Sequence, residues 1–286
     1  MTEPERLIEN GTFKKDFFNE EVRDEFTVSV PRKKIWAVEL DLMLQFDQVC
    51  KKHGLRYFLF CGSLLGAIRH RGFVPWDDDV DVAMPRDDYE RLLTLSYEFV
   101  EPYYLQIPCR DKGYFYSYSK LRNSNTSCRS INFGHRGFNQ GIFIDIFILD
   151  EWENTPDGEK TFLHLLNLYK KQSSWMRSKE EINDFDNPYD VSNEIDMLQC
   201  KYRGHNTAYW ALASMTLYGY SKSVFYADDF KESVLLPFEQ FYFPVPCGYE
   251  RILETMYGNW RKFPLPEERG RHHTGGLFDA DIPYKV

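Results

Sequence analysis

The stretch "WDDDVDV", residues 76–82, decides the fold, because it places four aspartates within five positions beside a run with the rhythm of a buried strand. The aspartates are Asp77, Asp78, Asp79 and Asp81. Like charges this close repel one another, and their burial costs several kcal/mol unless a positive charge lies among them. The stretch is therefore either a solvated acidic loop or a site that holds a cation.

The alternation of a strand brings two of these aspartates together. Successive side chains point to opposite faces, so Asp79 and Asp81 project to one face while Val80 and Val82 enter the core. Two hard carboxylate ligands at a strand end favour Mg²⁺ or Mn²⁺ over zinc.

The run "GIFIDIFIL" at 141–149 has the same alternation, with four isoleucines on one face and Asp145 between phenylalanines on the other. A lone aspartate in such a strand is costly unless it faces the same cation. Asp145 would then be a third ligand, or the base that accepts a proton from an attacking hydroxyl.

A phosphate site is predicted just upstream, in "CGSLLGAIRHRG" at 61–72. The turn at Gly62 and Ser63, between a strand and a short helix, leaves backbone N–H groups free to cradle a phosphate. Cationic partners are expected too, although each could be a solvated surface charge. The candidates are Lys120 and Arg122 on one strand face, Arg69 and Arg71 after the turn, and Arg269 and His272 near the C-terminus. Together these features indicate metal-assisted phosphoryl or nucleotidyl transfer.

Composition excludes several classes of protein. The formal charge of −9 disfavours generic binding to nucleic acid or to an anionic membrane. We find neither an amino-terminal apolar segment nor an apolar run near 18 residues, so no transmembrane segment is predicted. The six cysteines show no CxxC spacing, which favours free thiols in a reducing compartment and a cytoplasmic location. The histidines show no zinc-binding spacing, and His70 is interpreted as structural.

The periodicity predicts an α/β chain with a mixed (α+β) sheet up to about residue 150 and a mainly helical part after it. Residues 1–30 are interpreted as an arm or loosely packed lead-in, 31–153 as the core, and 154–286 as a mainly helical region. Expected helices are 32–53, 86–100, 156–178, roughly 190–222 and 248–257. Expected strands are 56–60, 80–84, 103–107, 114–122 and 141–149, with an extended segment at 234–246.

A family resemblance extends this interpretation. The stretch "GSLLGAIRHRGFVPWDDDVDVAMPRDDYERL" at 62–92 closely resembles the signature of the LicD family, which includes bacterial phosphocholine transferases and relatives of the fukutin-related sugar-phosphate transferases. Three more blocks resemble that family in the expected order: "YSKLRNSNT" at 118–126, "GIFIDIFILD" at 141–150 and "YGNWRKFPLPEERGRHH" at 257–273. The centre, 155–230, is less diagnostic, and we expect acceptor specificity to lie there.

The resemblance implies a nucleotidyltransferase-type catalytic core over 31–153, with the C-terminal motif packing back on it. It implies that Asp79 and Asp81 bind Mg²⁺ (or Mn²⁺), with Asp145 as the third carboxylate and Asp77 as an outer partner. Gly62 and Ser63 would hold the donor phosphate. The implied reaction moves phosphocholine from CDP-choline to a sugar hydroxyl of a surface glycan precursor, such as teichoic acid or lipopolysaccharide, and releases CMP.

Alternatives stay open at this point. The transferred group could be ribitol phosphate, glycerol phosphate or phosphoethanolamine, or the reaction could be nucleotidyl transfer to a small molecule. A choline donor predicts an aromatic cage, with Trp175, Trp210 and tyrosines 114, 116 and 118 as candidates. A protein that keeps the fold but only binds ligands is disfavoured, because all three carboxylates are present. A lipid-linked acceptor would require peripheral contact of the protein with the inner face of the membrane.

Overall fold

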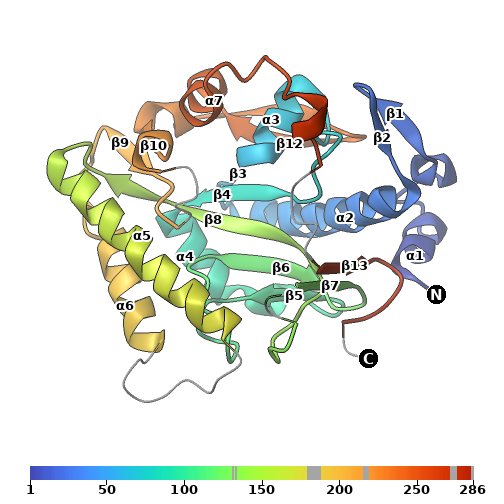
Figure 1. Ribbon diagram of the computed structural model, residues 1–286, viewed down its shortest axis with the longest axis horizontal. Coiled ribbons are helices and arrows are strands. Elements are labelled where there is room, and N and C mark those ends of the chain that lie inside the picture. Colours follow the sequence, from blue (N-terminus) through green and yellow to red (C-terminus); the bar gives the residue numbers. More distant parts are fainter. Residues whose placement is uncertain (131, 133, 179–187, 215–218, 271–275, 285–286) are drawn as a thin grey trace.

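A seven-stranded mixed sheet forms the centre of the protein in the computed structural model, which describes residues 1–130, 132, 134–178, 188–214, 219–270 and 276–284 (Figure 1). The longest strand, β8 (Ile142–Trp152), pairs in parallel with β4 (Asp81–Pro85), and β3 (Phe58–Leu59) pairs antiparallel with β4. On its other side, the first half of β8 pairs with β6 (Ser119–Asn123), and β6 pairs with β5 (Tyr103–Gln106).

The C-terminal part continues the same sheet. The last three residues of β8 pair with β9 (Tyr209–Ala211), and β9 pairs with β10 (Val224–Tyr226). The main hydrophobic core also contains residues from both parts of the chain, for example Ile146 and Ile252. The region after residue 153 therefore shares a sheet and a core with the region before it.

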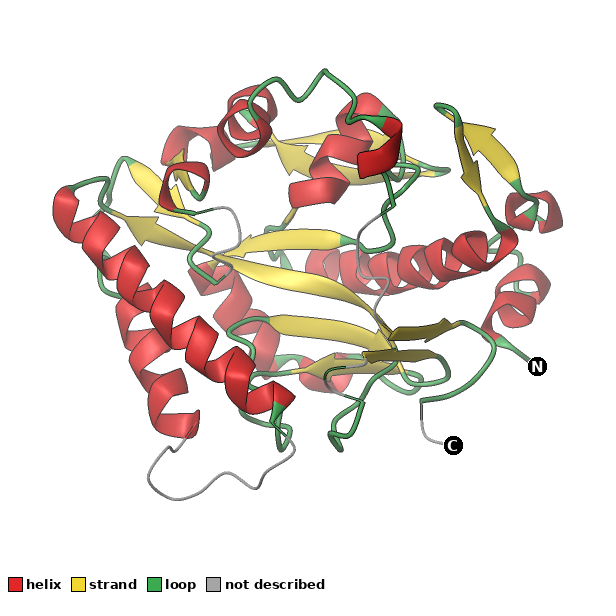
Figure 2. Cartoon of the chain, in the orientation of Figure 1, coloured by secondary structure: helices red, strands yellow, loops and turns green. Residues whose placement is uncertain are grey.

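Helices pack around this sheet (Figure 2). The long helix α2 contacts β8, and α4 contacts β4 and β8. The isoleucine face of β8 is fully buried, as its alternation predicts, and Tyr89 of α4 forms a hydrogen bond of 2.8 Å with Ser119 of β6. The main helices are α2 (Val30–His53), α3 (Cys61–Arg69), α4 (Arg86–Thr94), α5 (Pro156–Arg177), α6 (Pro188–Gln199) and α7 (Tyr249–Tyr257).

Residues 1–30 differ from the loosely packed lead-in expected from the sequence. They form α1 (Glu3–Glu9), the 3₁₀ turn η1 (Lys15–Phe18) and a hairpin of β1 (Glu21–Arg23) and β2 (Phe26–Val28). Leu7, Phe13 and Phe18 are buried in the main core. The expectation was wrong because these apolar residues have no helical or strand period, yet they still bury their side chains.

The helix expected over roughly 190–222 is also too long. Helix α6 ends at Gln199, and Gly204 (φ +81°) and Asn206 (φ +50°) then adopt left-handed backbone conformations that cannot continue a helix. Strands β9 and β10 follow. The extended segment at 234–246 is confirmed as a hairpin of β11 (Ser233–Phe238) and β12 (Phe241–Pro246). Outside these elements, β7 (Ser127–Ser130) pairs with β13 (Gly276–Asp279).

All six cysteines are free, as their spacing predicted. Among the described residues, none of the helices has both the length and the apolar character needed to cross a bilayer.

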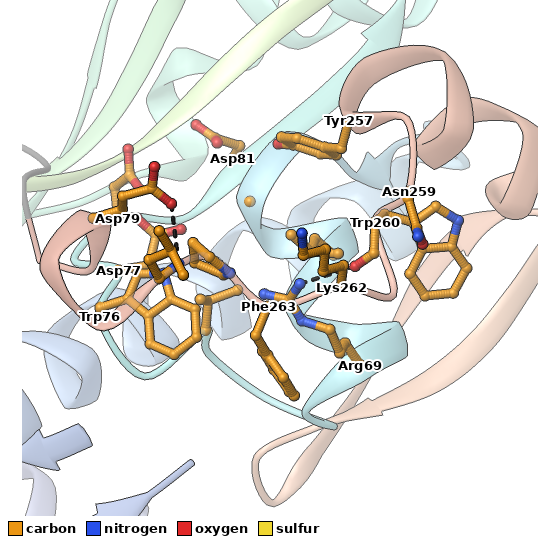
Figure 3. Close-up of a pocket in the computed structure, with 16 residues that line it drawn as sticks. Arg69, Trp76, Asp77, Asp79, Asp81, Tyr257, Asn259, Trp260, Lys262 and Phe263 are labelled. Carbon is orange, nitrogen blue, oxygen red and sulfur yellow. Dashed lines mark hydrogen bonds between the residues drawn. The ribbon is translucent and has the colours of Figure 1, made fainter. Parts of the chain in front are cut away.

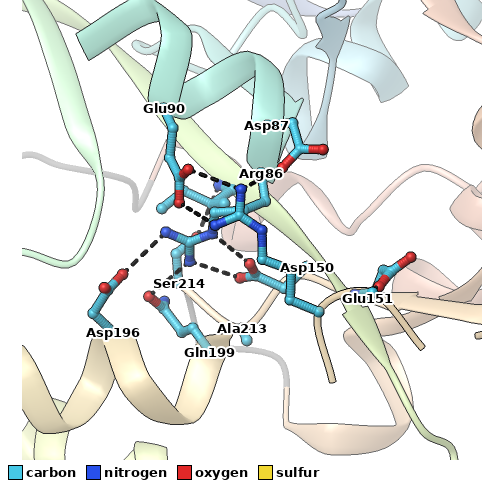
Figure 4. Close-up of polar contacts among 12 residues, drawn as sticks. Arg86, Asp87, Glu90, Asp150, Glu151, Asp196, Gln199, Ala213 and Ser214 are labelled. Atoms are coloured by element: carbon cyan, nitrogen blue, oxygen red, sulfur yellow. Dashed lines mark hydrogen bonds and ion pairs between the residues drawn. The ribbon is translucent and has the colours of Figure 1, made fainter. Parts of the chain in front are cut away.

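A buried ion pair ties β4, β8 and α6 together (Figure 4). Arg86, directly after β4, donates two hydrogen bonds to Asp150 of β8, at 2.7 and 3.2 Å. Its guanidinium also reaches Asp196 and Gln199 of α6, at 3.1 and 3.2 Å. The side chains of Arg86 and Asp150 are only 8% and 2% exposed, so removing one would leave an uncompensated buried charge.

We predict that Arg86→Met lowers the free energy of unfolding by about 3 kcal/mol or more, because Asp150 loses its buried partner. Urea titration followed by circular dichroism measures this. Arg203→Ala is the matched control, since Arg203 pairs with Asp87 and Glu90 at the exposed surface and should cost less than about 1 kcal/mol. Equal losses in the two variants would contradict the prediction.

Candidate functional site

The strand register places Asp81 and Asp145 directly beside each other. They are Cα partners in the parallel β4–β8 pair, and the Asp145 N–H donates to the Val80 carbonyl at 2.8 Å. One carboxylate oxygen from each of Asp79, Asp81 and Asp145 can be chosen so that all three lie within 4.8 Å of one another. The three carboxylates that the sequence singled out therefore meet at one point.

The turn at Gly62 and Ser63 holds this strand end in place. Both residues lie in the first turn of α3, and the Phe60 N–H donates to the Asp81 carbonyl at 2.9 Å. Ser63 is buried, and its Oγ accepts a hydrogen bond from the Asp81 N–H at 2.9 Å. A Cβ on Gly62 would lie 2.4 Å from Oδ2 of Asp77, so a larger residue at this position would displace that carboxylate. The turn thus holds the backbone of Asp81 directly and lies close to the Asp77 carboxylate.

The electrostatics of the cluster favour a bound cation. Burial raises the pKa of Asp81 well above its usual range, and the neighbouring charges of Asp79 and Asp145 raise it further. Glu39 of α2, which the sequence reasoning did not single out, lies behind the cluster and is 1% exposed. Burial, followed by the charges of the Asp77–Asp79 stretch, also raises the Glu39 pKa well above its usual range. A divalent cation among these groups would relieve the repulsion.

The donor set fits magnesium or manganese. All three groups offer hard carboxylate oxygens, and these oxygens lie close enough together for one ion to be shared among them. Asp77, Asp78 and Asp79 form a second acidic group of the same size, with Asp79 common to both. Asp79, Asp81 and Asp145 would hold the ion, with Asp77 next to it.

A pocket of about 670 Å³ opens in front of Asp77, Asp79 and Asp81 (Figure 3). Its far wall comes from α3 and from the segment after α7, where Arg69, Asn259 and Lys262 face the acidic side across the pocket. Aromatic side chains complete the lining: Trp76, Tyr257, Trp260 and Phe263. One side of the pocket thus carries the aspartates and the other the cations, while aromatic rings lie on both sides, with Trp76 next to Asp77 and Phe263 next to Arg69 (Figure 3).

Arg69 is the most buried cation of this wall. One of its Nη atoms donates to the Trp260 carbonyl at 2.9 Å, and its guanidinium lies 4.7 Å from the centre of the Phe263 ring. Its Nε is buried without a hydrogen-bond partner in the described chain. Burial lowers the Arg69 pKa, and Arg269 contributes in the same direction. A half-buried guanidinium of this kind is suited to bind an anion.

Lys120 and Arg122, the first choice for phosphate binding, lie elsewhere. The Lys120 ammonium pairs with Asp145, and burial lowers its pKa although Asp145 acts in the opposite direction. Arg122 is buried and donates to Gln106 at 2.6 Å and to the Gly141 carbonyl at 2.7 Å. Neither residue lines the pocket.

The remaining cations are also placed by the structure, except one. Arg71 is exposed and is not among the pocket residues. Arg269 stacks 4.7 Å over Trp76 and donates to the Asp24 and Pro264 carbonyls, at 2.8 and 3.2 Å, so it supports the aromatic wall from behind. His272 lies outside the described residues. Of the predicted phosphate-binding residues, Gly62 and Arg69 line the pocket.

Sequence reasoning did not single out Lys262 and Asn259. Both belong to the 257–273 block, but their neighbours Arg261 and Arg269 carry the same charge signal, and nothing in the spacing shows which side chain faces the pocket. The turn after Gly258 determines which side chains face the pocket. In this turn the Lys262 N–H donates to the Asn259 carbonyl at 3.0 Å.

A mixed sheet that brings two carboxylates at the start of one strand beside a third on the next strand, next to a pocket with a cationic wall, is the arrangement of a nucleotidyltransferase-type enzyme. Comparison with known proteins agrees: residues 54–183 match the family model described as LicD/FKTN/FKRP, nucleotidyltransferase domain. The protein carries a LicD-family domain and is a phosphotransferase.

Two relatives illustrate the breadth of the similarity. The chain is 28% identical over 250 residues to the lipopolysaccharide cholinephosphotransferase LicD of Haemophilus influenzae. The aligned region covers 82% of this chain and 92% of that protein. The chain is also 50% identical over 40 residues to the human ribitol 5-phosphate transferase FKRP. That aligned region covers 14% of this chain and 8% of FKRP.

His70 lies behind the aromatic wall and has the structural character expected of it. Its side chain is 4% exposed, and its ring lies 5.9 Å from the Trp76 ring and 5.6 Å from the Phe263 ring. Its Nε2 lies 3.3 Å from Oδ2 of Asp24, although neither ring nitrogen makes a hydrogen bond in the described chain. Burial, and then the charge of Arg69, lowers the His70 pKa to about 4. His70 is therefore neutral in the folded protein at neutral pH.

We predict that this histidine makes the protein less stable in mild acid. Because its folded pKa lies below that of the unfolded chain, the unfolded state binds the extra proton, and stability falls as the pH drops from about 6.5 to about 4. His70→Phe cannot bind this proton, so acidification over that range should lower its free energy of unfolding by about 3 kcal/mol less than it lowers that of the wild type. Urea titrations at pH 7 and pH 4.5 measure the difference. An unchanged difference between the two proteins would show that His70 does not titrate in this way.

Proposed function

We propose that this protein transfers a phospho-alcohol group, with phosphocholine from CDP-choline favoured, to a sugar hydroxyl of a cell-surface glycan precursor and releases CMP. Lipopolysaccharide is the leading acceptor, because it appears in the name of the relative that shares most of the chain, and teichoic acid is the other candidate. The observation that carries the proposal is the carboxylate cluster of Asp79, Asp81 and Asp145, of which Asp79 and Asp81 line one pocket together with Arg69 and Lys262.

The chemistry divides between the two ends of the pocket. A divalent ion held by Asp79, Asp81 and Asp145 would neutralise charge on the diphosphate of the donor. Arg69 and Lys262 bind the phosphate oxygens from the opposite wall, and the aromatic residues exclude water and offer faces for the nucleoside. The acceptor oxygen forms a bond to the phosphorus that carries the alcohol, the hydroxyl proton is released, and the bond to CMP breaks.

We assign Asp145 the role of third metal ligand rather than base. One of its oxygens already accepts from Lys120, and its register beside Asp81 would bring it next to an ion held by that residue. The order of these strands, and not the pocket alone, supports a metal-assisted transfer.

Ribitol phosphate is the second candidate group. The 50% identity to a ribitol 5-phosphate transferase over 40 residues favours it. The aromatic residues considered for a choline cage do not discriminate, because Tyr116 and Tyr118 surround Lys120, and Trp210 stacks on Phe230 with ring centres 5.3 Å apart.

The test is release of CMP from CDP-choline, CDP-ethanolamine, CDP-ribitol and CDP-glycerol, each with Mg²⁺ and with a chelator. We expect metal-dependent CMP from one donor, faster with a lipopolysaccharide or teichoic acid precursor, and no CMP from an Asp79→Asn/Asp81→Asn variant. Failure of every donor to bind in the presence of Mg²⁺ or Mn²⁺ would refute the CDP-alcohol assignment.

We further predict that Lys262→Ala raises the KM for the donor about tenfold, because one charge-assisted hydrogen bond to a phosphate is lost. Arg261→Ala is the control, since Arg261 pairs with Glu250 at the surface, 3.0 Å away, and does not line the pocket. Steady-state kinetics with the preferred donor measure both. Similar KM values for the two variants would remove Lys262 from the donor site.

A further inference from the structure

Lys120 lies beside the carboxylate cluster but outside the pocket. In the antiparallel β6–β8 pair its Cα partner is Asp145, and in the parallel β4–β8 pair the partner of Asp145 is Asp81. The three residues therefore stand side by side on three neighbouring strands. Because opposite residues in a sheet project to the same face, Lys120 flanks Asp145 on one side and Asp81 flanks it on the other.

Aromatic rings fix the ammonium group in this position. The Lys120 Nζ lies 3.5 Å from the centre of the Phe143 ring, 5.3 Å from that of Tyr118 and 5.7 Å from that of Tyr116. The residue is only 5% exposed, and its ammonium pairs with Oδ1 of Asp145. A lysine held by an ion pair and by these rings cannot swing out to follow a substrate phosphate without breaking both sets of contacts.

The charge of the cluster explains why a cation is needed there. Asp79, Asp81 and Asp145 bring three carboxylates to one point, and Lys120 directly contacts one of them. The Lys120 ammonium occupies one oxygen of the Asp145 carboxylate, and its positive charge repels a divalent ion that approaches the other oxygen. It also keeps the Asp145 side chain in a single orientation next to Asp81.

We propose that Lys120 is a positioning residue that serves as the internal counter-ion of Asp145, and that it sets the affinity of the carboxylate cluster for its divalent ion rather than binding the donor phosphate. This inference rests on the proposed function only in that it assumes a divalent ion at Asp79, Asp81 and Asp145. It assigns a different role to a lysine whose charge, seen in the sequence alone, suggested phosphate binding.

The test measures Mn²⁺ binding by electron paramagnetic resonance, in the absence of any nucleotide. Lys120→Met and Lys120→Gln remove the charge, and both should bind Mn²⁺ about tenfold more tightly than wild type, because a repelling charge close to the ion is gone. Lys120→Arg keeps the charge and should stay near wild type. Arg122→Met is the matched control, since Arg122 is buried two residues along the same strand but bonds Gln106 and the Gly141 carbonyl instead.

The outcomes separate the competing roles. Unchanged Mn²⁺ affinity in a folded neutral variant overturns the proposal, and if weaker binding of a CDP-alcohol accompanies it, Lys120 is a phosphate ligand after all. If Lys120→Met does not fold, Lys120→Gln decides, because glutamine can still donate a hydrogen bond to Asp145. A wild-type protein that binds no Mn²⁺ contradicts the metal site of the proposed function itself, whereas equal binding by wild type and variants contradicts this inference alone.

Discussion

The register of three neighbouring strands is the constraint on which the site depends. Parallel pairing of β4 with β8 sets Asp81 against Asp145, and antiparallel pairing of β6 with β8 sets Lys120 against the same aspartate. A shift of one residue in either pair would turn the charged side chains to the isoleucine face, where α2 and α4 pack. The interactions that hold the register, such as Ser63 with the Asp81 N–H and Arg86 with Asp150, therefore belong to the site although they touch no substrate.

The second constraint is the cost of collecting like charges in a buried place. The neighbourhood of Asp81 raises its pKa, and Glu39 behind the cluster is affected in the same way. Folding tolerates this because Lys120 and Arg32 offset part of the charge and a divalent cation can offset the rest. The same repulsion that destabilises the cluster without a cation would draw an ion into it.

Parts of the chain that are distant in sequence contribute opposite sides of the pocket. The acidic end comes from one strand and the loop before it, and the opposite wall from α3 and the segment after α7. The C-terminal block thus supplies the wall that faces the acidic residues across the pocket. Because β9, β10 and much of the C-terminal part share the sheet and core of the first part, the two ends of the pocket are held as one unit.

The sequence by itself determined the local features. Alternation in "VDVAM" and "GIFIDIFIL" predicted strands that bury valine and isoleucine on one face and carry aspartates on the other, and β4 and β8 confirm both. The tertiary structure alone decided which charges meet. Strand alternation cannot show that Lys120 is the partner of Asp145, because pairing joins residues 25 positions apart. The sequence also cannot show that Lys262 faces the pocket while Arg269 supports the wall of the pocket. The two residues carry the same charge, and only the turn of the chain after Gly258 distinguishes them. Residues 1–30, and residues 200–214 within the helix expected over roughly 190–222, were misjudged for the same physical reason: their burial comes from contacts with distant elements, which a local period does not record.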